Sequence, residues 1–141
     1  MVYSLQCKDC VPFIHDITSG KVIKVYNGDT ITIASILPYD DYPLYHWSVR
    51  LKGIESPEMK SKNKSEKECA NIAQKTLSEF IFDKHVELRN VQMEKYGRIL
   101  ADVYYHNVNL STFMLAKRLA VSYDGRRKQC PENWIEFYCK E

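Results

Sequence analysis

Three short motifs in this 141-residue chain gather the side chains that could do chemistry. They read Asn27-Gly28-Asp29-Thr30, then Val49-Arg50-Leu51-Lys52-Gly53-Ile54-Glu55-Ser56-Pro57-Glu58, then Glu94-Lys95-Tyr96-Gly97-Arg98. Each motif alone has a simpler interpretation as a hairpin turn, an exposed strand end or a second turn. Together they hold what phosphodiester hydrolysis needs: a cation on hard oxygen ligands, an oriented water and positive charge for the phosphate.

The charged residues of the motifs match these requirements one by one. Asp29 and Glu55 are carboxylates suited to a hard cation such as calcium. Glu58 lies three residues beyond Glu55, past a proline that restrains the backbone, and could hold or deprotonate the water. The planar forks of Arg50 and Arg98 match phosphate oxygens. Three carboxylates and two arginines therefore predict a site for one divalent cation and one phosphate.

Alternating apolar residues predict the strands that position these motifs. β-branched residues from Lys21 to Ile36 flank the Asn27-Gly28-Asp29 turn, which predicts a hairpin with Asp29 just after its turn. A third strand is predicted from His46 to Ile54. Val86 to Met93 and Ile99 to Tyr105 predict two more strands, joined by the third motif.

Helical periodicity predicts two main helices and a short C-terminal one. Ser65 and Glu68 have the spacing of a capping box, which predicts a helix from about 65 to 82. Its apolar stripe is Cys69, Ile72, Ala73, Thr76, Leu77 and Phe80. A second helix is predicted over Ser111 to Val121, and a short one near Pro131 to Tyr138 because proline suits a first turn. The order β-β-β-α-β-β-α predicts an α+β fold built on a five-stranded barrel of the OB type.

The composition describes one ordinary globular domain, with 45% hydrophobic and 27% charged residues. We expect residues 1–18 to be an N-terminal extension and 19–141 to be the domain. The net charge is only +2, so contact with nucleic acid must be local. Residues 1–20 lack a basic leader with a long apolar run, which predicts an intracellular protein, cytoplasmic or nuclear, without a membrane contact. A monomer is expected.

Five cysteines are an odd number, which favours reduced thiols over a complete set of disulfides. Cys69 is predicted to be a core residue of the first helix. Cys7 and Cys10 have the gap of a zinc knuckle, and Cys130 and Cys139 could complete four thiolates if the termini meet. The second pair lacks knuckle spacing, so structural zinc is the weaker alternative.

The three motifs, in this order and on these elements, resemble the staphylococcal nuclease (thermonuclease) family over about residues 19–123. The resemblance implies that Asp29 and Glu55 bind one calcium ion, with the backbone carbonyl of Ser56 as a further ligand. It implies that Glu58 orients or activates the water. The residues implied to stabilise the transition state are Arg50 and Arg98. The residues implied to contact the nucleic acid are Lys95, Tyr96, Tyr123, Lys60 and Lys62.

The activity implied is that of a calcium-dependent endonuclease, acting on DNA and RNA with little sequence specificity and leaving 3′-phosphate ends. Glu55 departs from the family, which has aspartate there. Its extra methylene could shift the ion, change the choice of divalent metal or lower activity. The alternative is a weak or inactive barrel that binds nucleic acid or a protein partner. All five charged positions are filled, which favours the enzyme.

Overall fold

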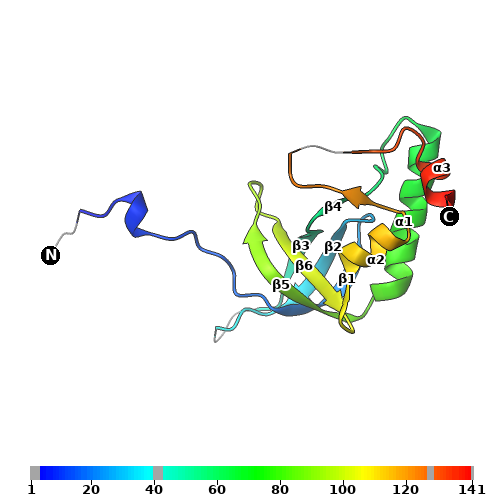
Figure 1. Cartoon of the computed structure of the whole chain (residues 1–141). Helices are drawn as coiled ribbons and strands as arrows, with labels where there is room; N and C mark the ends of the chain where they lie inside the picture. The colour runs from blue at the N-terminus through cyan, green and yellow to red at the C-terminus, as the bar shows by residue number, and fades with distance from the viewer. Residues whose placement is uncertain (1–3, 40–42, 127–128, 141) are drawn as a thin grey trace.

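Five long strands close into a barrel in the computed structural model, which describes residues 4–39, 43–126 and 129–140 (Figure 1). In chain order the elements are η1 (Cys7–Asp9), β1 (Ser19–Val25), β2 (Thr30–Ser35), β3 (Tyr45–Leu51), β4 (Ile54–Glu55), α1 (Lys64–Ile81), β5 (His85–Met93), β6 (Ile99–Tyr105), β7 (Val108–Asn109), α2 (Leu110–Ala116), β8 (Val121–Ser122) and α3 (Trp134–Cys139). α1, α2 and α3 lie together at one side of the barrel (Figure 1). This confirms the predicted OB-type barrel with two main helices and a short terminal one.

The barrel is closed by one parallel pairing. β1 pairs antiparallel with β2 and β5, β2 with β3, and β5 with β6. β3 then runs parallel to β6, with Val49 opposite Ile99 and Leu51 opposite Ala101. Alternate residues of these strands point inward, so their β-branched and aliphatic side chains fill the interior. The core includes Val22, Ile31, Ile33, Val49, Leu51, Ile99 and Val103.

The first hairpin forms as predicted, but its glycine serves packing rather than turn geometry. Gly28 does not have a positive φ. A Cβ atom on Gly28 would lie 2.8 Å from Cβ of Ala73 on α1 and 2.9 Å from Cβ of Ser56. The turn can therefore press against α1 and the segment after β4 only because residue 28 has no side chain. That contact brings Asp29 beside Ser56.

The third strand ends earlier than predicted. β3 stops at Leu51, and Gly53 adopts a φ of 88° in the turn that follows. Ile54 and Glu55 then form the separate strand β4, which pairs with β8, so Glu55 lies opposite Val121. Apolar and polar residues alternate continuously from 46 to 54 in the sequence, so this pattern could not reveal the break between β3 and β4. The turn is what brings Glu55 back towards Arg50.

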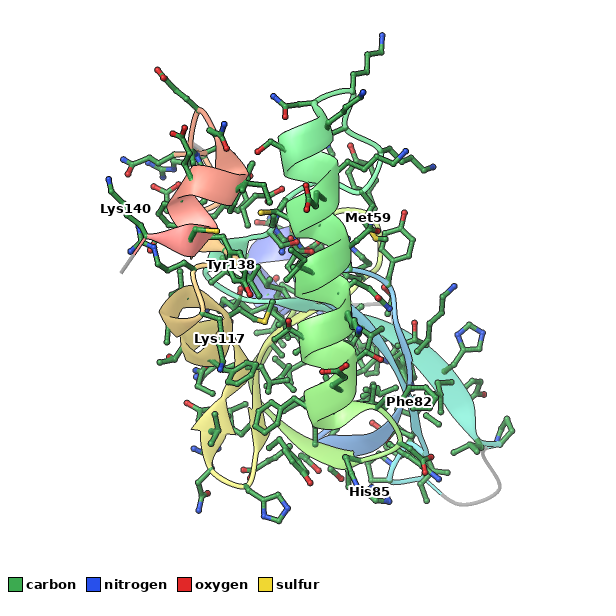
Figure 2. All side chains as sticks on the ribbon, turned by 90° about the vertical axis from the view of Figure 1, so that its right-hand side faces the viewer. Met59, Phe82, His85, Lys117, Tyr138 and Lys140 are labelled. Carbon is green, nitrogen blue, oxygen red and sulfur yellow. The ribbon has the colours of Figure 1, made fainter. Side chains whose placement is uncertain are left out.

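The N-cap of the first helix lies two residues earlier than predicted. Asn63 is the N-cap, and its Oδ1 accepts a 3.1 Å hydrogen bond from the backbone N of Glu66. The prediction of Ser65 as N-cap is wrong: its hydroxyl donates instead to Asn133 Oδ1, 2.8 Å away. This bond joins the start of α1 to the start of α3. Figure 2 shows α3, marked by Tyr138, beside the N-terminal half of α1.

Two further helix boundaries differ from the predictions. α2 ends at Ala116 rather than Val121, because Arg118 takes a positive φ of 59° and turns the chain towards β8. Val121 then pairs with β4 as a strand residue. α3 begins at Trp134, with Asn133 as its N-cap, so Pro131 precedes the helix instead of opening it.

The start of the described N-terminal segment extends away from the barrel, on the side opposite α3 (Figure 1), whereas Ile17 near its end is buried in the core. Its two cysteines, Cys7 and Cys10, are exposed, as are Cys130 and Cys139. No group of three or more His, Cys, Asp or Glu side chains placed to hold a metal occurs among the described residues. Cys69 is buried on α1, as predicted. Within the same residues, no helix combines the length and the apolar character needed to cross a membrane.

Candidate functional site

An open cleft of about 930 Å³ collects residues from all three motifs. The predicted site residues that line it are Asp29, Arg50, Glu55, Ser56, Glu58, Lys60, Lys95, Tyr96, Arg98 and Tyr123. Lys62 is exposed in the same loop as Lys60 but does not line the cleft. The barrel thus brings together ends of strands that are far apart in the sequence.

Arg50 is the centre of a buried charged group at this cleft. Its Nη2 donates a 2.7 Å hydrogen bond to Oε2 of Glu55, and its Nη1 lies 3.2 Å from Oδ2 of Asp29. All three residues are less than a tenth exposed. Burial strengthens these charge-assisted contacts, because little water competes for them. β3, β4 and the turn after β1 each supply one member of the group.

Asp29 is held in place by three hydrogen bonds. Its Oδ1 accepts from the hydroxyl of Thr30 at 2.9 Å, and its Oδ2 accepts from both the backbone N and the hydroxyl of Ser56, at 2.9 and 3.0 Å. The resemblance assigned Ser56 a role only through its carbonyl. The structure adds that the amide and hydroxyl of Ser56 fix the carboxylate of Asp29.

The donor chemistry of this group fits a divalent cation. Two buried carboxylates share one guanidinium, so the group carries a net negative charge that a cation would offset. A carboxylate oxygen has two lone pairs, and Oδ1 of Asp29 accepts only one of the hydrogen bonds described above. Nη1 of Arg50 is buried and has no hydrogen-bond partner among the described residues, because its contact with Asp29 is poorly aligned. It could donate to a phosphate oxygen.

Glu58 lies in the loop between β4 and α1, and a residue that the sequence analysis missed holds that loop. The side chain of Glu58 is exposed at the cleft. Its backbone N donates to Oε2 of Glu66 at 2.9 Å, and the Ser61 hydroxyl donates to Oε1 of Glu66 at 3.0 Å. The available signal was the spacing of Asn63 and Glu66, which matches that of Ser65 and Glu68.

Arg98 lies on the β5–β6 hairpin, and its guanidinium is hydrogen-bonded within the turn of that hairpin. Its Nε and Nη2 donate to the same oxygen of Glu94, at 3.0 and 2.9 Å. Glu94 was in the third motif but was not predicted to hold Arg98. Tyr96 is 84% exposed beside it. Tyr123 follows β8, with its ring centroid 5.9 Å from Cζ of Arg50, so two tyrosines present rings to the cleft.

Comparisons with known proteins found a matching family model and two similar proteins. A family model described as "Staphylococcal nuclease homologue" matches residues 48–139. A Haemophilus influenzae protein named "Uncharacterized endonuclease" is 33% identical over 103 residues, covering 73% of this chain and 51% of that protein. A "Probable endonuclease" of Schizosaccharomyces pombe is 32% identical over 85 residues, covering 55% of this chain and 37% of that protein. The chain therefore spans about half or less of the length of these two relatives.

Proposed function

This chain belongs to the staphylococcal nuclease family, and from that premise we propose that it is a calcium-dependent endonuclease acting on DNA and RNA. The observation that carries the proposal is the buried group of Arg50, Asp29 and Glu55 at the base of an open cleft. A cluster of this kind costs stability when it serves only the fold, because three charges must leave water. Its place at a cleft supports a role in binding a cation and a phosphate.

The residues that would hold one calcium ion are Asp29, Glu55 and the carbonyl of Ser56, and another divalent cation would meet the same donors. When bound, such a cation supplies charge neutralisation at the phosphate and acidifies a coordinated water. The donor set is hard oxygen throughout. That chemistry favours calcium, magnesium or manganese over softer metals.

The chain's own residues would then accept the proton of the water and stabilise the negative charge of the transition state. The oxygen of a water attacks phosphorus while Glu58 accepts the water's proton, and the bond from phosphorus to the 5′-oxygen breaks. The leaving oxygen takes a proton from solvent, and the phosphate stays on the 3′ side. Arg50 and Arg98 donate hydrogen bonds to the non-bridging oxygens, where negative charge builds in the transition state.

Little sequence preference follows from the groups that face the cleft. Lys95 and Lys60 in the cleft, with Lys62 beside it on the loop before α1, would contact phosphates, which carry no base information. The rings of Tyr96 and Tyr123 offer stacking surfaces, and every base has a π-face. We therefore propose that the enzyme reads the nucleic-acid backbone and accepts single and double strands.

The deciding experiment is a cleavage assay on plasmid DNA and on RNA, with calcium, magnesium or EDTA. Arg50→Ala and Glu58→Ala are each expected to lower cleavage at least ~100-fold, and EDTA to abolish it. Arg89→Ala is the matched control, since Arg89 is an exposed arginine paired with Glu87 outside the cleft. Cleavage that persists in EDTA, or in both variants, would refute the mechanism.

A second candidate is a catalytically weak or silent barrel that binds nucleic acid or a protein partner. One observation favours it: Glu55 replaces the family's aspartate and engages Nη2 of Arg50 at 2.7 Å. An arginine held in that way is less available to a phosphate. Binding of nucleic acid without cleavage in any divalent metal would select this candidate.

We also propose that residues 1–18 form an extension to a domain over 19–141, and that the protein is a monomer. The start of β1 at Ser19 supports the boundary, and Ile17, which is buried in the core, attaches the end of the extension to the domain. Light scattering on the full chain and on a 19–141 chain would test both statements.

A further inference from the structure

Tyr26 is an aromatic residue of the cleft that the proposed mechanism does not use. It follows β1 directly and precedes the Asn27-Gly28 turn that carries Asp29. Its backbone N donates to the carbonyl of Thr30 at 3.0 Å, which fixes its place at the mouth of the hairpin. The side chain is 50% exposed and lines the cleft. Because this aromatic side chain is half exposed at a cleft, we interpret it as a binding surface rather than as a core residue.

The first hairpin explains why the cleft reaches Tyr26. Thr30, whose carbonyl accepts the hydrogen bond from Tyr26, lies opposite Arg50 in the pairing of β2 with β3. Tyr26 and Arg50 both line the cleft. The cleft therefore extends from the Arg50 group to the end of β1.

A basic side chain accompanies the ring. Lys24 lies two residues before Tyr26, and its Nζ is 6.0 Å from the centroid of the ring. One face of the ring then lies under an ammonium group, which leaves the other for a planar ligand. A ring for the base and a cation for the phosphate are the combination that single-stranded nucleic acid requires.

We propose that Tyr26 and Lys24 form a further nucleotide subsite, in which the ring stacks on an unpaired base and the ammonium contacts the adjoining phosphate. The base belongs to a nucleotide near the scissile phosphate, because Tyr26 is three residues from Asp29 in the same cleft. Duplex bases have both faces covered by their neighbours, so the occupant is single-stranded or locally unpaired. The subsite rests on the proposed function for its location, but it needs no cleavage to be observed.

The test is binding of a short fluorescein-labelled oligothymidylate to the full chain, in a Glu58→Ala background with calcium and again in EDTA. Tyr26→Ala is expected to weaken binding ~5-fold or more, because stacking contributes at least ~1 kcal/mol per base. Tyr26→Phe keeps the ring and should bind within about twofold of its parent. Lys24→Ala should lower the slope of log affinity against log salt by about 1.

Tyr104→Ala is the matched control. Its ring lies 4.0 Å beneath Arg89 and borders a separate hollow, so the same substitution removes another cation–π tyrosine outside the cleft. It should leave oligothymidylate binding unchanged.

The outcomes separate this inference from the nuclease proposal. Tyr26-dependent binding by a chain that never cleaves would support the subsite and refute the enzyme. Active cleavage, together with unchanged binding in Tyr26→Ala, would support the enzyme and refute the subsite. Absence of binding in both conditions, or an equal loss of affinity for a blunt duplex, would overturn stacking on an unpaired base.

Discussion

Arg50 and Glu55 form a 2.7 Å ion pair across the two-residue turn that separates β3 from β4. The longer side chain of glutamate reaches Nη2 of the guanidinium, one of the two nitrogens that would clamp a phosphate. The departure from the family's aspartate therefore bears on Arg50 as well as on the metal ligands. This ion pair also links Arg50, which would bind a phosphate, to Glu55, which would bind a cation.

Shortening this side chain should release Arg50. In Glu55→Asp we expect calcium-supported cleavage equal to or higher than that of the natural chain, because Nη2 becomes available to phosphate while a carboxylate remains for the metal. Steady-state kcat and KM on plasmid DNA measure the effect. Glu55→Gln is the control: it keeps the length, loses the charge and should weaken calcium binding in a titration. A large loss of cleavage in Glu55→Asp would show that the site is built around the longer side chain.

Glu66 should act as a positioning residue for Glu58. Its carboxylate holds the backbone of Glu58 and the hydroxyl of Ser61. Glu66→Ala is expected to lower kcat about 10-fold with little change in KM, because misplacement of a proton acceptor slows the chemical step rather than binding. Glu66→Gln keeps one acceptor oxygen and should recover part of the rate. Glu68→Ala, at an exposed position of the same helix, controls for charge, and an equal loss there would contradict the assignment.

Gly28 should tolerate no side chain. A Cβ would lie within 3.0 Å of Ala73 and Ser56, so Gly28→Ala must move the turn or α1. We expect a loss of about 1–3 kcal/mol in the free energy of unfolding, measured by urea denaturation. Gly53→Asn is the control, since Gly53 needs a positive φ that asparagine accepts and has open space around it. Equal stability of the two variants would remove the packing argument.

Cys69 should be the slowest thiol to react. Burial raises the pKa of its thiol to about 11, with smaller contributions from Glu68 and Cys139. At pH 8 this leaves about 100-fold less thiolate than an ordinary cysteine with the usual value of 9.0 would have. Alkylation followed by peptide mass spectrometry should label Cys7, Cys10 and Cys139 before Cys69. In urea the difference should disappear, whereas rapid labelling in the native state would contradict the burial.

The sequence was enough to predict the strands and most of the candidate site. Alternation over 99–105, and on either side of the bulge near Asn90 in β5, reflects one face of each strand turned to the core, a local rule that needs no partner. Asp29, Arg50 and Glu58 could be singled out because the three motifs combine carboxylates and arginines that suit a cation, a water and a phosphate. Helix ends were predicted less well: Asn63 and Ser65 each precede a glutamate by three residues, so spacing alone could not choose between them.

Tertiary contacts decided what spacing could not. Ser65 bonds to Asn133, and Glu66 bonds to the loop of Glu58, so Asn63 is left to cap α1. The pairing of β4 with β8 makes Val121 a strand residue, and the turn at Gly53 places Glu55 against Arg50. These contacts join residues up to 68 positions apart. The sequence by itself determined which side chains could do chemistry. Closure of the barrel decided which of them meet, because it alone brings distant strand ends into one cleft.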